Sequence, residues 1–283
     1  MNIRIRDITG FLVASRIPNL LIISYTQFVT ARFLMGISID RIITVEFLIL
    51  LVSTGMIGAG GYIINDYFDQ KIDMINRPKK VVVGPDLRRR FALASHVLLS
   101  FGGIALGFFI DPLVGLIHIF STGALWTYSG GIRKVLLLST LTISFLTILT
   151  ILLVMVFFRE ISILAVVYSL FGCATVFVRE TLKDIMSAKG EQAFGIQSVP
   201  IVWGIRGAKL IIYLVCFAGI SLLFLYLISI DSWTVRTFFM ALVPFISWLL
   251  YKLVKADRLK DFQQLKRSID FVIVAGLVSM LLV

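Results

Sequence analysis

The sequence predicts an all-α integral membrane protein with nine transmembrane helices, and two observations carry this prediction. The 283 residues are 59% apolar and only 15% charged, with a mean hydropathy of +0.98, whereas soluble domains are roughly 45–50% apolar and about a quarter charged. So few polar residues could not cover the core of a soluble protein of this length. The apolar residues also form long runs separated by short basic clusters, as expected when lipid is the solvent.

A transmembrane helix needs about 20 mostly apolar residues. Nine segments are predicted on this basis: 17–36, 43–64, 91–110, 112–129, 135–157, 161–178, 208–229, 233–251 and 269–283. The fourth should begin at Asp111-Pro112, because proline suits the first turn of a helix. No linker or change of composition separates the segments, so residues 1–283 are expected to form a single domain.

The distribution of basic residues predicts the orientation of the chain. If the N-terminus is cytoplasmic, the loops on that side hold all but four of the 27 lysines and arginines, the exceptions being Arg32, Arg41, Arg159 and Arg236. Cytoplasmic loops carry an excess of Lys and Arg, so the N-terminus is expected inside and the C-terminus outside. The longer, acid-rich loops lie on the same side, which therefore should hold the active site. In a bacterium the membrane would be the cell inner membrane.

The net charge does not indicate a nucleic-acid-binding protein, and the cysteines do not indicate disulfides or a CxxC metal site. The charge of +11 is spread over short clusters and forms no continuous basic stripe, so membrane lipid is an expected partner and nucleic acid is not. Cys173 and Cys216 lie within apolar runs. They are predicted to be small buried residues, outside any disulfide or CxxC metal site.

Three aspartates follow the second predicted span. Asp66, Asp69 and Asp73 share one stripe of a helix, with Asn65 and Asn76 near it. Carboxylates this close raise one another's pKa unless a positive charge lies between them. A hard cation such as Mg²⁺ binds carboxylate oxygens and completes its shell with water and phosphate oxygens. The stripe therefore predicts a metal-bridged diphosphate site. Basic residues that would assist it follow directly: Arg77, Lys79 and Lys80.

The run from Asn65 to Pro78 resembles a known signature. It fits NDxxDxxxDxxNRP, the first signature of the UbiA superfamily of intramembrane prenyltransferases, at every defined position. Arg16-Ile17-Pro18-Asn19 resembles the element at the start of the family's first helix. Tyr128-Ser129, followed by Arg133-Lys134, resembles its Tyr-Ser-basic element after the fourth helix. Nine helices with a cytoplasmic N-terminus also match the architecture of the family.

The second acidic signature of the family, expected after the sixth helix, departs from the pattern. Alignment on Gly195 and Ser198 places the family's DxxxD at Ser187 and Glu191, so that a serine replaces the first aspartate. Asp184 lies one helical turn before Ser187, and positions 180, 184, 187 and 191 share a face. Asp184 is therefore expected to take over as metal ligand.

The resemblance implies a Mg²⁺-dependent enzyme. It would transfer a prenyl group from an allylic isoprenoid diphosphate, such as geranylgeranyl diphosphate, to an acceptor and release pyrophosphate. The allylic cation would form in a central apolar cavity of the helical bundle, where water cannot quench it. The implied catalytic residues are Asp66, Asp69, Asp73, Asp184 and Tyr128. The implied metal ligands are Asp66, Asp69, Asp73, Asp184 and Glu191. The implied diphosphate-binding residues are Asn65, Asn76, Arg77, Lys79, Arg133, Lys134 and Lys183.

The acceptor is predicted from two local patterns. Arg179-Glu180-x-x-Lys183-Asp184, and the Lys-Lys-Val-Val-Val-Gly run after Asn-Arg-Pro, resemble the branch that prenylates glycerol phosphate ethers, the digeranylgeranylglyceryl phosphate synthase type. A prenylglycerol phosphate is the expected acceptor. Prenylation of an aromatic quinone or haem precursor, terpene cyclisation and ion-coupled transport stay open. Acids and bases clustered at one side of the membrane favour an enzyme over a transporter.

Overall fold

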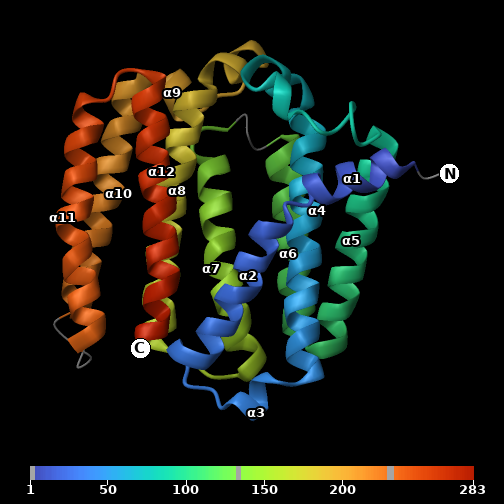
Figure 1. Cartoon of the computed structure of the whole chain (residues 1–283), viewed down its shortest axis with the longest axis vertical. Coiled ribbons are helices and arrows are strands. Elements are labelled where there is room, and N and C mark those ends of the chain that lie inside the picture. Colours follow the sequence, from blue (N-terminus) through green and yellow to red (C-terminus); the bar gives the residue numbers. More distant parts are fainter. Residues whose placement is uncertain (1–3, 132–134, 228–232) are drawn as a thin grey trace.

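The computed structural model describes residues 4–131, 135–227 and 233–283, and within these ranges the chain is helical with no β-strand. Long helices stand roughly side by side and form a bundle (Figure 1). Six of the described helices are long and apolar enough to cross a membrane: Val45–Asn76, Arg89–Ile110, Leu138–Phe158, Ile163–Ala193, Gly204–Phe224 and Arg236–Lys255. The prediction of an all-α integral membrane protein is confirmed at this level.

The predicted count of nine spans is not confirmed. A seventh candidate span among the described residues consists of the bent pair α1 (Ile5–Ala14) and α2 (Ile17–Val29) with its π-helical continuation η1 (Thr30–Leu34). The helices α6 (Pro112–Gly130) and α12 (Leu259–Ser279) form as well, but neither is among these candidate spans. α12 begins ten residues before the predicted segment, at a charged stretch that lowers its hydropathy.

Two helices extend well past their predicted spans. α4 (Val45–Asn76) continues twelve residues beyond position 64, and α8 (Ile163–Ala193) continues fifteen beyond position 178. The extensions are polar but contain no proline, so the backbone hydrogen bonds of the helix continue through them. α4 ends where Pro78 opens the short 3₁₀ helix η2 (Pro78–Lys80). α8 ends just before Gly195, whose φ of +68° suits a helix terminus.

The remaining helices complete the bundle. They are α3 (Ile39–Ile42), α5 (Arg89–Ile110), α7 (Leu138–Phe158), α9 (Val199–Val202), α10 (Gly204–Leu227), α11 (Trp233–Lys255) and the 3₁₀ helix η4 (Met280–Leu282). α4 packs on α5 and α6, and α8 packs on α7, α10 and α12. In Figure 1, α2 crosses the bundle obliquely between the α4–α6 group and the α8–α12 group.

The fourth predicted helix begins where the sequence placed it. Asp111 is the N-cap of α6 and accepts a hydrogen bond from the Leu113 backbone N–H at 2.7 Å. Arg159 contacts the same carboxylate at 3.0 Å. The backbone hydrogen bond first, and then the guanidinium, hold the pKa of Asp111 below its usual value. This cap fixes the tight turn between α5 and α6 at the end of the bundle opposite the aspartates.

The short helix α1 fastens the loop that follows η2. Asp7 is buried and pairs with the Arg88 guanidinium at 2.6 Å, while Arg6 pairs with Asp86 at 2.9 Å. Gly10 allows this approach, because a Cβ there would lie 2.8 Å from the Asp86 carbonyl oxygen. The hydrogen bond from Arg88 is the main cause of a lowered pKa at Asp7. The N-terminal helix thus holds the loop after the aspartate motif against the bundle.

Candidate functional site

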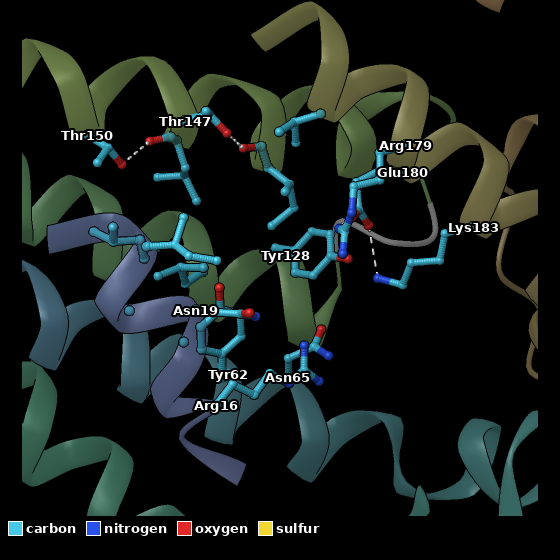
Figure 2. Close-up of a pocket in the computed structure, with 18 of the residues that line it drawn as sticks. Arg16, Asn19, Tyr62, Asn65, Tyr128, Thr147, Thr150, Arg179, Glu180 and Lys183 are labelled. Atoms are coloured by element: carbon cyan, nitrogen blue, oxygen red, sulfur yellow. Dashed lines mark hydrogen bonds and ion pairs between the residues drawn. The ribbon is translucent and has the colours of Figure 1, made fainter. Parts of the chain in front are cut away.

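A cavity of about 950 Å³ lies among α2, α4, α6, α7, α8 and α12. At one end, which we call the motif end, the extensions of α4 and α8 line it with polar and charged side chains. Farther in, the walls become mainly apolar, with residues such as Ile57, Leu125, Leu146 and Phe171. Figure 2 shows polar residues from several helices pointing into this space. The expected central cavity is therefore present, and its polarity changes along its length.

The α4 wall carries the three aspartates of the first motif, which all line the cavity. Asp66 accepts an ion-pair contact from Arg16 at 2.7 Å, and Asp69 accepts a hydrogen bond from the Asn65 side-chain N–H₂ at 3.0 Å. Among the described residues no three Asp, Glu, His or Cys side chains already form a metal-binding group. The carboxylates thus share one helix stripe, as predicted, but are held by neighbouring Arg and Asn side chains.

Arg16 occupies an unusual backbone conformation at the bend between α1 and α2. Its φ of 51° and ψ of 52° lie in the left-handed region, which costs a non-glycine residue about 1–2 kcal/mol. This conformation places the guanidinium on Asp66 and 4.9 Å from the centre of the Tyr62 ring. Strained residues of this kind cluster at functional sites. Arg16 belongs to a run that resembles a family element, but no role at the site was predicted for it from the sequence.

The α8 wall carries the second acidic motif, which departs from the family pattern at Ser187. Ser187 donates a hydrogen bond to Glu191 Oε1 at 2.5 Å, and both residues line the cavity. Glu191 is 2% exposed, and its Oε2 has no hydrogen-bond partner among the described residues. A buried carboxylate oxygen without a partner is costly. Glu191 is therefore the residue of this motif best placed to accept a cation.

Asp184, which the sequence predicts to replace the missing aspartate, lies elsewhere. Its carboxylate accepts a hydrogen bond from Thr140 of α7 at 3.1 Å, and it is not among the residues that line the cavity. It stands at the edge of the helix face that Ser187 and Glu191 share. Its role as a metal ligand stays a prediction from the sequence.

Asn76 joins the two walls. Its side-chain N–H₂ donates to the Ser187 carbonyl at 3.1 Å, and its Oδ1 accepts from the Gly190 backbone N–H at 3.1 Å. Glycine is required at 190, because a Cβ there would overlap the Asn76 amide. The sequence predicted that Asn76 binds diphosphate. In the structure its amide aligns the second motif against the first.

Replacing Gly190 with alanine should therefore disturb the site. The added methyl would push the Asn76 amide away and separate the two walls, and such overpacking typically costs about 1–3 kcal/mol. We expect a folded membrane protein with a raised Mg²⁺ requirement for turnover. Gly123→Ala on α6 is the matched control, because a Cβ there meets nothing within 4 Å. Equal Mg²⁺ titrations for the two variants would contradict the role assigned to Asn76.

The other predicted site residues divide into four groups. Tyr128 is buried and reaches from α6 into the cavity, toward Arg179 and Glu180 of α8 in Figure 2. Arg77 and Lys79 line the cavity at the motif end. Lys183 lines it too and pairs with Glu180 at 2.9 Å. Arg133 and Lys134 lie outside the described residues.

Arg179 and Lys266 are charged residues of the cavity wall for which no role at the site was predicted. Arg179 of α8 pairs with Glu180 at 2.6 Å and with Asp270 of α12 at 2.8 Å. Lys266 of α12 pairs with the same Asp270 at 2.7 Å. The position of Arg179 directly after an apolar run could have indicated it, because ionisable groups at membrane depth usually have a function. Lys266 gave no such signal, since only the packing of α12 on α8 brings it to the cavity.

The donor atoms at the motif end fit Mg²⁺. All candidate ligands are oxygens, the kind that this hard cation prefers. Two buried oxygens there, Asn65 Oδ1 and Glu191 Oε2, have no hydrogen-bond partner among the described residues. They belong to opposite walls, α4 and α8. A cation bound between these walls would offset the charge of the aspartate stripe.

Fold and site together define a polytopic membrane protein with an oxygen-lined, metal-compatible site at one end of a mainly apolar cavity. The profile of the UbiA prenyltransferase family matches residues 28–272. The chain belongs to this family, and the resemblance deduced from its motifs is confirmed. It is thus an enzyme of the prenyltransferase class.

Curated relatives and solved structures agree with this assignment. Digeranylgeranylglyceryl phosphate synthase of Methanothermobacter thermautotrophicus is 30% identical over 190 residues, 66% of this chain and 67% of the relative. Digeranylgeranylglyceryl phosphate synthase of Methanosarcina mazei is 27% identical over 237 residues, which are 78% of this chain and 77% of the relative. A structure reported for digeranylgeranylglyceryl phosphate synthase superposes with a TM-score of 0.75 at 18% identity, covering 98% of each chain. A structure of a UbiA homologue from Archaeoglobus fulgidus, bound to GPP and Mg²⁺, superposes with a TM-score of 0.67 at 11% identity. The match covers 96% of this chain and 99% of the homologue. At these identities the structural matches establish the fold.

Proposed function

We propose that this enzyme transfers a prenyl group from an allylic isoprenoid diphosphate to a hydroxyl of a prenylglycerol phosphate, forming an ether and releasing pyrophosphate. The observation that carries the proposal is the cavity, which joins a charged, oxygen-lined end to a mainly apolar interior. Such a space suits a ligand with a diphosphate head and an isoprenoid tail. The names of the similar proteins in M. thermautotrophicus and M. mazei support the choice of acceptor.

In this proposal Asp66, Asp69 and Asp73 of α4 and Glu191 of α8 hold Mg²⁺ together with the diphosphate. When bound, Mg²⁺ would neutralise the negative charge that grows on the leaving group as the carbon–oxygen bond breaks. Asn65 would contribute its unpartnered oxygen. Asn76 would align the two walls. The role of Asp184 as a metal ligand stays a separate prediction.

Basic residues complete the diphosphate site. Arg77, Lys79 and Lys183 are proposed to bind the diphosphate oxygens and stabilise the pyrophosphate as it leaves. Arg133 and Lys134, which lie outside the described residues, are proposed from the sequence to assist. The apolar walls exclude water from the allylic cation, and Tyr128 is proposed to face that cation from α6. The acceptor oxygen then bonds to the allylic carbon and loses its proton.

The experiment is product analysis by mass spectrometry. Purified enzyme receives geranylgeranyl diphosphate and Mg²⁺ with a panel of acceptors: a prenylglycerol phosphate, an aromatic quinone precursor, a haem precursor, and none. We expect an ether product from the first acceptor, and no product in EDTA. Product from an aromatic or haem acceptor alone would reassign the acceptor, and a hydrocarbon formed without acceptor would indicate a cyclase. Turnover unaffected by EDTA would contradict the Mg²⁺ site, and no consumption of any diphosphate would contradict the proposed reaction.

We further propose that residues 1–283 form one prenyltransferase domain with the motif end in the cytoplasm. The excess of Lys and Arg at that end supports this orientation. A reporter inserted near Pro85 should therefore lie in the cytoplasm, and one fused after Val283 should lie outside. Signals from the same side would mean that the number of spans is even.

A further inference from the structure

The α8 and α12 wall of the cavity holds a cluster of charges separate from the aspartate stripe. Arg179 and Lys266 both contact Asp270, with distances of 2.8 and 2.7 Å, and Glu180 contacts Arg179 at 2.6 Å. Both cations line the cavity, and their side chains are 34% and 22% exposed. Ionisable groups at such a depth in a membrane protein usually serve a ligand.

This cluster lies on the α12 side of the cavity, well before Glu191 along α8. Arg179 precedes Glu191 by twelve residues on the same helix, which corresponds to about 18 Å along α8 at 1.5 Å per residue. The diphosphate is assigned to the motif end, between the aspartates and Glu191. Arg179 and Lys266 are not among the residues assigned to the diphosphate, and Glu180 connects Arg179 to Lys183, which is among them.

Along α12, the cavity-facing side changes from charged to apolar. Lys266 comes first, and the residues that follow it in the cavity wall are Ile273, Gly276, Leu277 and Met280. Spacings of seven, three and four residues place Lys266, Ile273, Gly276 and Leu277 on one stripe of α12, and Met280 follows at the start of η4. A stripe with a cation at one end and apolar side chains beyond it matches a ligand that has an anionic head and an apolar tail.

We propose that Arg179 and Lys266 bind the phosphate of the acceptor, and that the acceptor's own prenyl chain lies along the stripe from Ile273 to Met280. This inference rests on the proposed function, in which the acceptor is a prenylglycerol phosphate. A phosphate monoester carries about −1.5 to −2 charge at pH 7, and a planar guanidinium recognises it with two parallel hydrogen bonds. Among the described residues Arg179 donates two hydrogen bonds, from its five N–H groups.

Asp270 pairs with both proposed phosphate-binding residues. Its carboxylate bridges the two cations and so occupies the place that a phosphate oxygen would take. Binding of the acceptor must therefore compete with Asp270 for both basic side chains. Removing its charge should strengthen acceptor binding, whereas removing either cation should weaken it.

The test measures acceptor affinity in Arg179→Gln, Lys266→Gln and Asp270→Asn, with purified proteins in lipid nanodiscs. Binding of a prenylglycerol phosphate is measured without the allylic diphosphate, and KM for each substrate is measured in turnover. We expect Arg179→Gln and Lys266→Gln to weaken acceptor binding about tenfold or more, because each loses a charged hydrogen bond. KM for the diphosphate should change less than about threefold, and Asp270→Asn should bind acceptor more tightly than the unchanged enzyme.

Several controls separate binding from a structural role. If the charges only held α8 to α12, all three variants would weaken binding alike, and that result would overturn the proposal. Lys266→Arg keeps the positive charge and should therefore bind the acceptor better than Lys266→Gln does. This pair of variants tests the proposal even if Arg179→Gln does not fold. A prenylglycerol without phosphate should bind all variants equally weakly. If the unchanged enzyme prenylates only an aromatic acceptor, the proposed function fails. If it prenylates the phosphate acceptor while the cation variants keep normal affinity, this inference fails alone.

Discussion

Asp66→Asn should abolish prenyl transfer, with a loss of about a hundredfold or more, in the range seen when charge stabilisation of a transition state is removed. Asp66 lines the cavity with Asp69 and Asp73 on one stripe of α4. The amide keeps the shape of the side chain but removes the negative charge that a hard cation requires. The measurement is the rate of product formation from geranylgeranyl diphosphate over a Mg²⁺ titration. The same loss is expected for Asp69→Asn.

The variant must be shown to be folded, because Asp66 also pairs with Arg16. That pair is partly exposed, with side-chain exposures of 42% and 15%, and such pairs contribute at most about 1 kcal/mol. We therefore expect Asp66→Asn to purify as a monodisperse protein with a melting temperature near that of the unchanged enzyme. Asp257→Asn, at an aspartate that is 88% exposed, is the matched control and should remain active. Normal turnover of Asp66→Asn would refute the metal site.

Glu191→Gln should cost most of the activity, and more than Asp184→Asn. Glu191 is buried, lines the cavity and has an unpartnered oxygen, whereas Asp184 is turned toward Thr140. The sequence alone favours the opposite order, since Asp184 is the nearest aspartate to the altered position. Turnover of both variants over a Mg²⁺ titration decides between them. A silent Glu191→Gln with an inactive Asp184→Asn would mean that α8 turns or shifts when the cation binds.

Ser187→Asp provides the complementary change. Ser187 already lies within hydrogen-bonding distance of Glu191, at 2.5 Å. A second carboxylate there would repel Glu191 unless a cation lies between them. We expect the variant to be less thermally stable in EDTA than the unchanged enzyme and to need less Mg²⁺ for half-maximal turnover. An apparent Mg²⁺ affinity that stays the same would place the cation away from α8.

Much of the site could be predicted because it is local in sequence. The spacing of Asp66, Asp69 and Asp73 fixes them on one stripe wherever the helix packs, and the oxygen chemistry follows from the residue types. The match of the surrounding run to NDxxDxxxDxxNRP then indicated the family, which the profile match over residues 28–272 confirmed. The span predicted for α4 ends at position 64, because a hydropathy criterion ends a span at the first polar residues, although the aspartate stripe was correctly predicted to be helical.

Composition and the aspartate motif were sufficient to establish an all-α membrane protein of the UbiA family, because both depend only on residue type and on spacing within one helix. The tertiary structure decided which side chains meet across helices. Asp184 accepts a hydrogen bond from Thr140, and Asn76 joins α4 to α8. Lys266 of α12 and Arg179 of α8 share the partner Asp270. Helical periodicity defines which residues share a face, but the rotation of that face toward a cavity is set by packing against neighbouring helices. No pattern within a single helix contains that information.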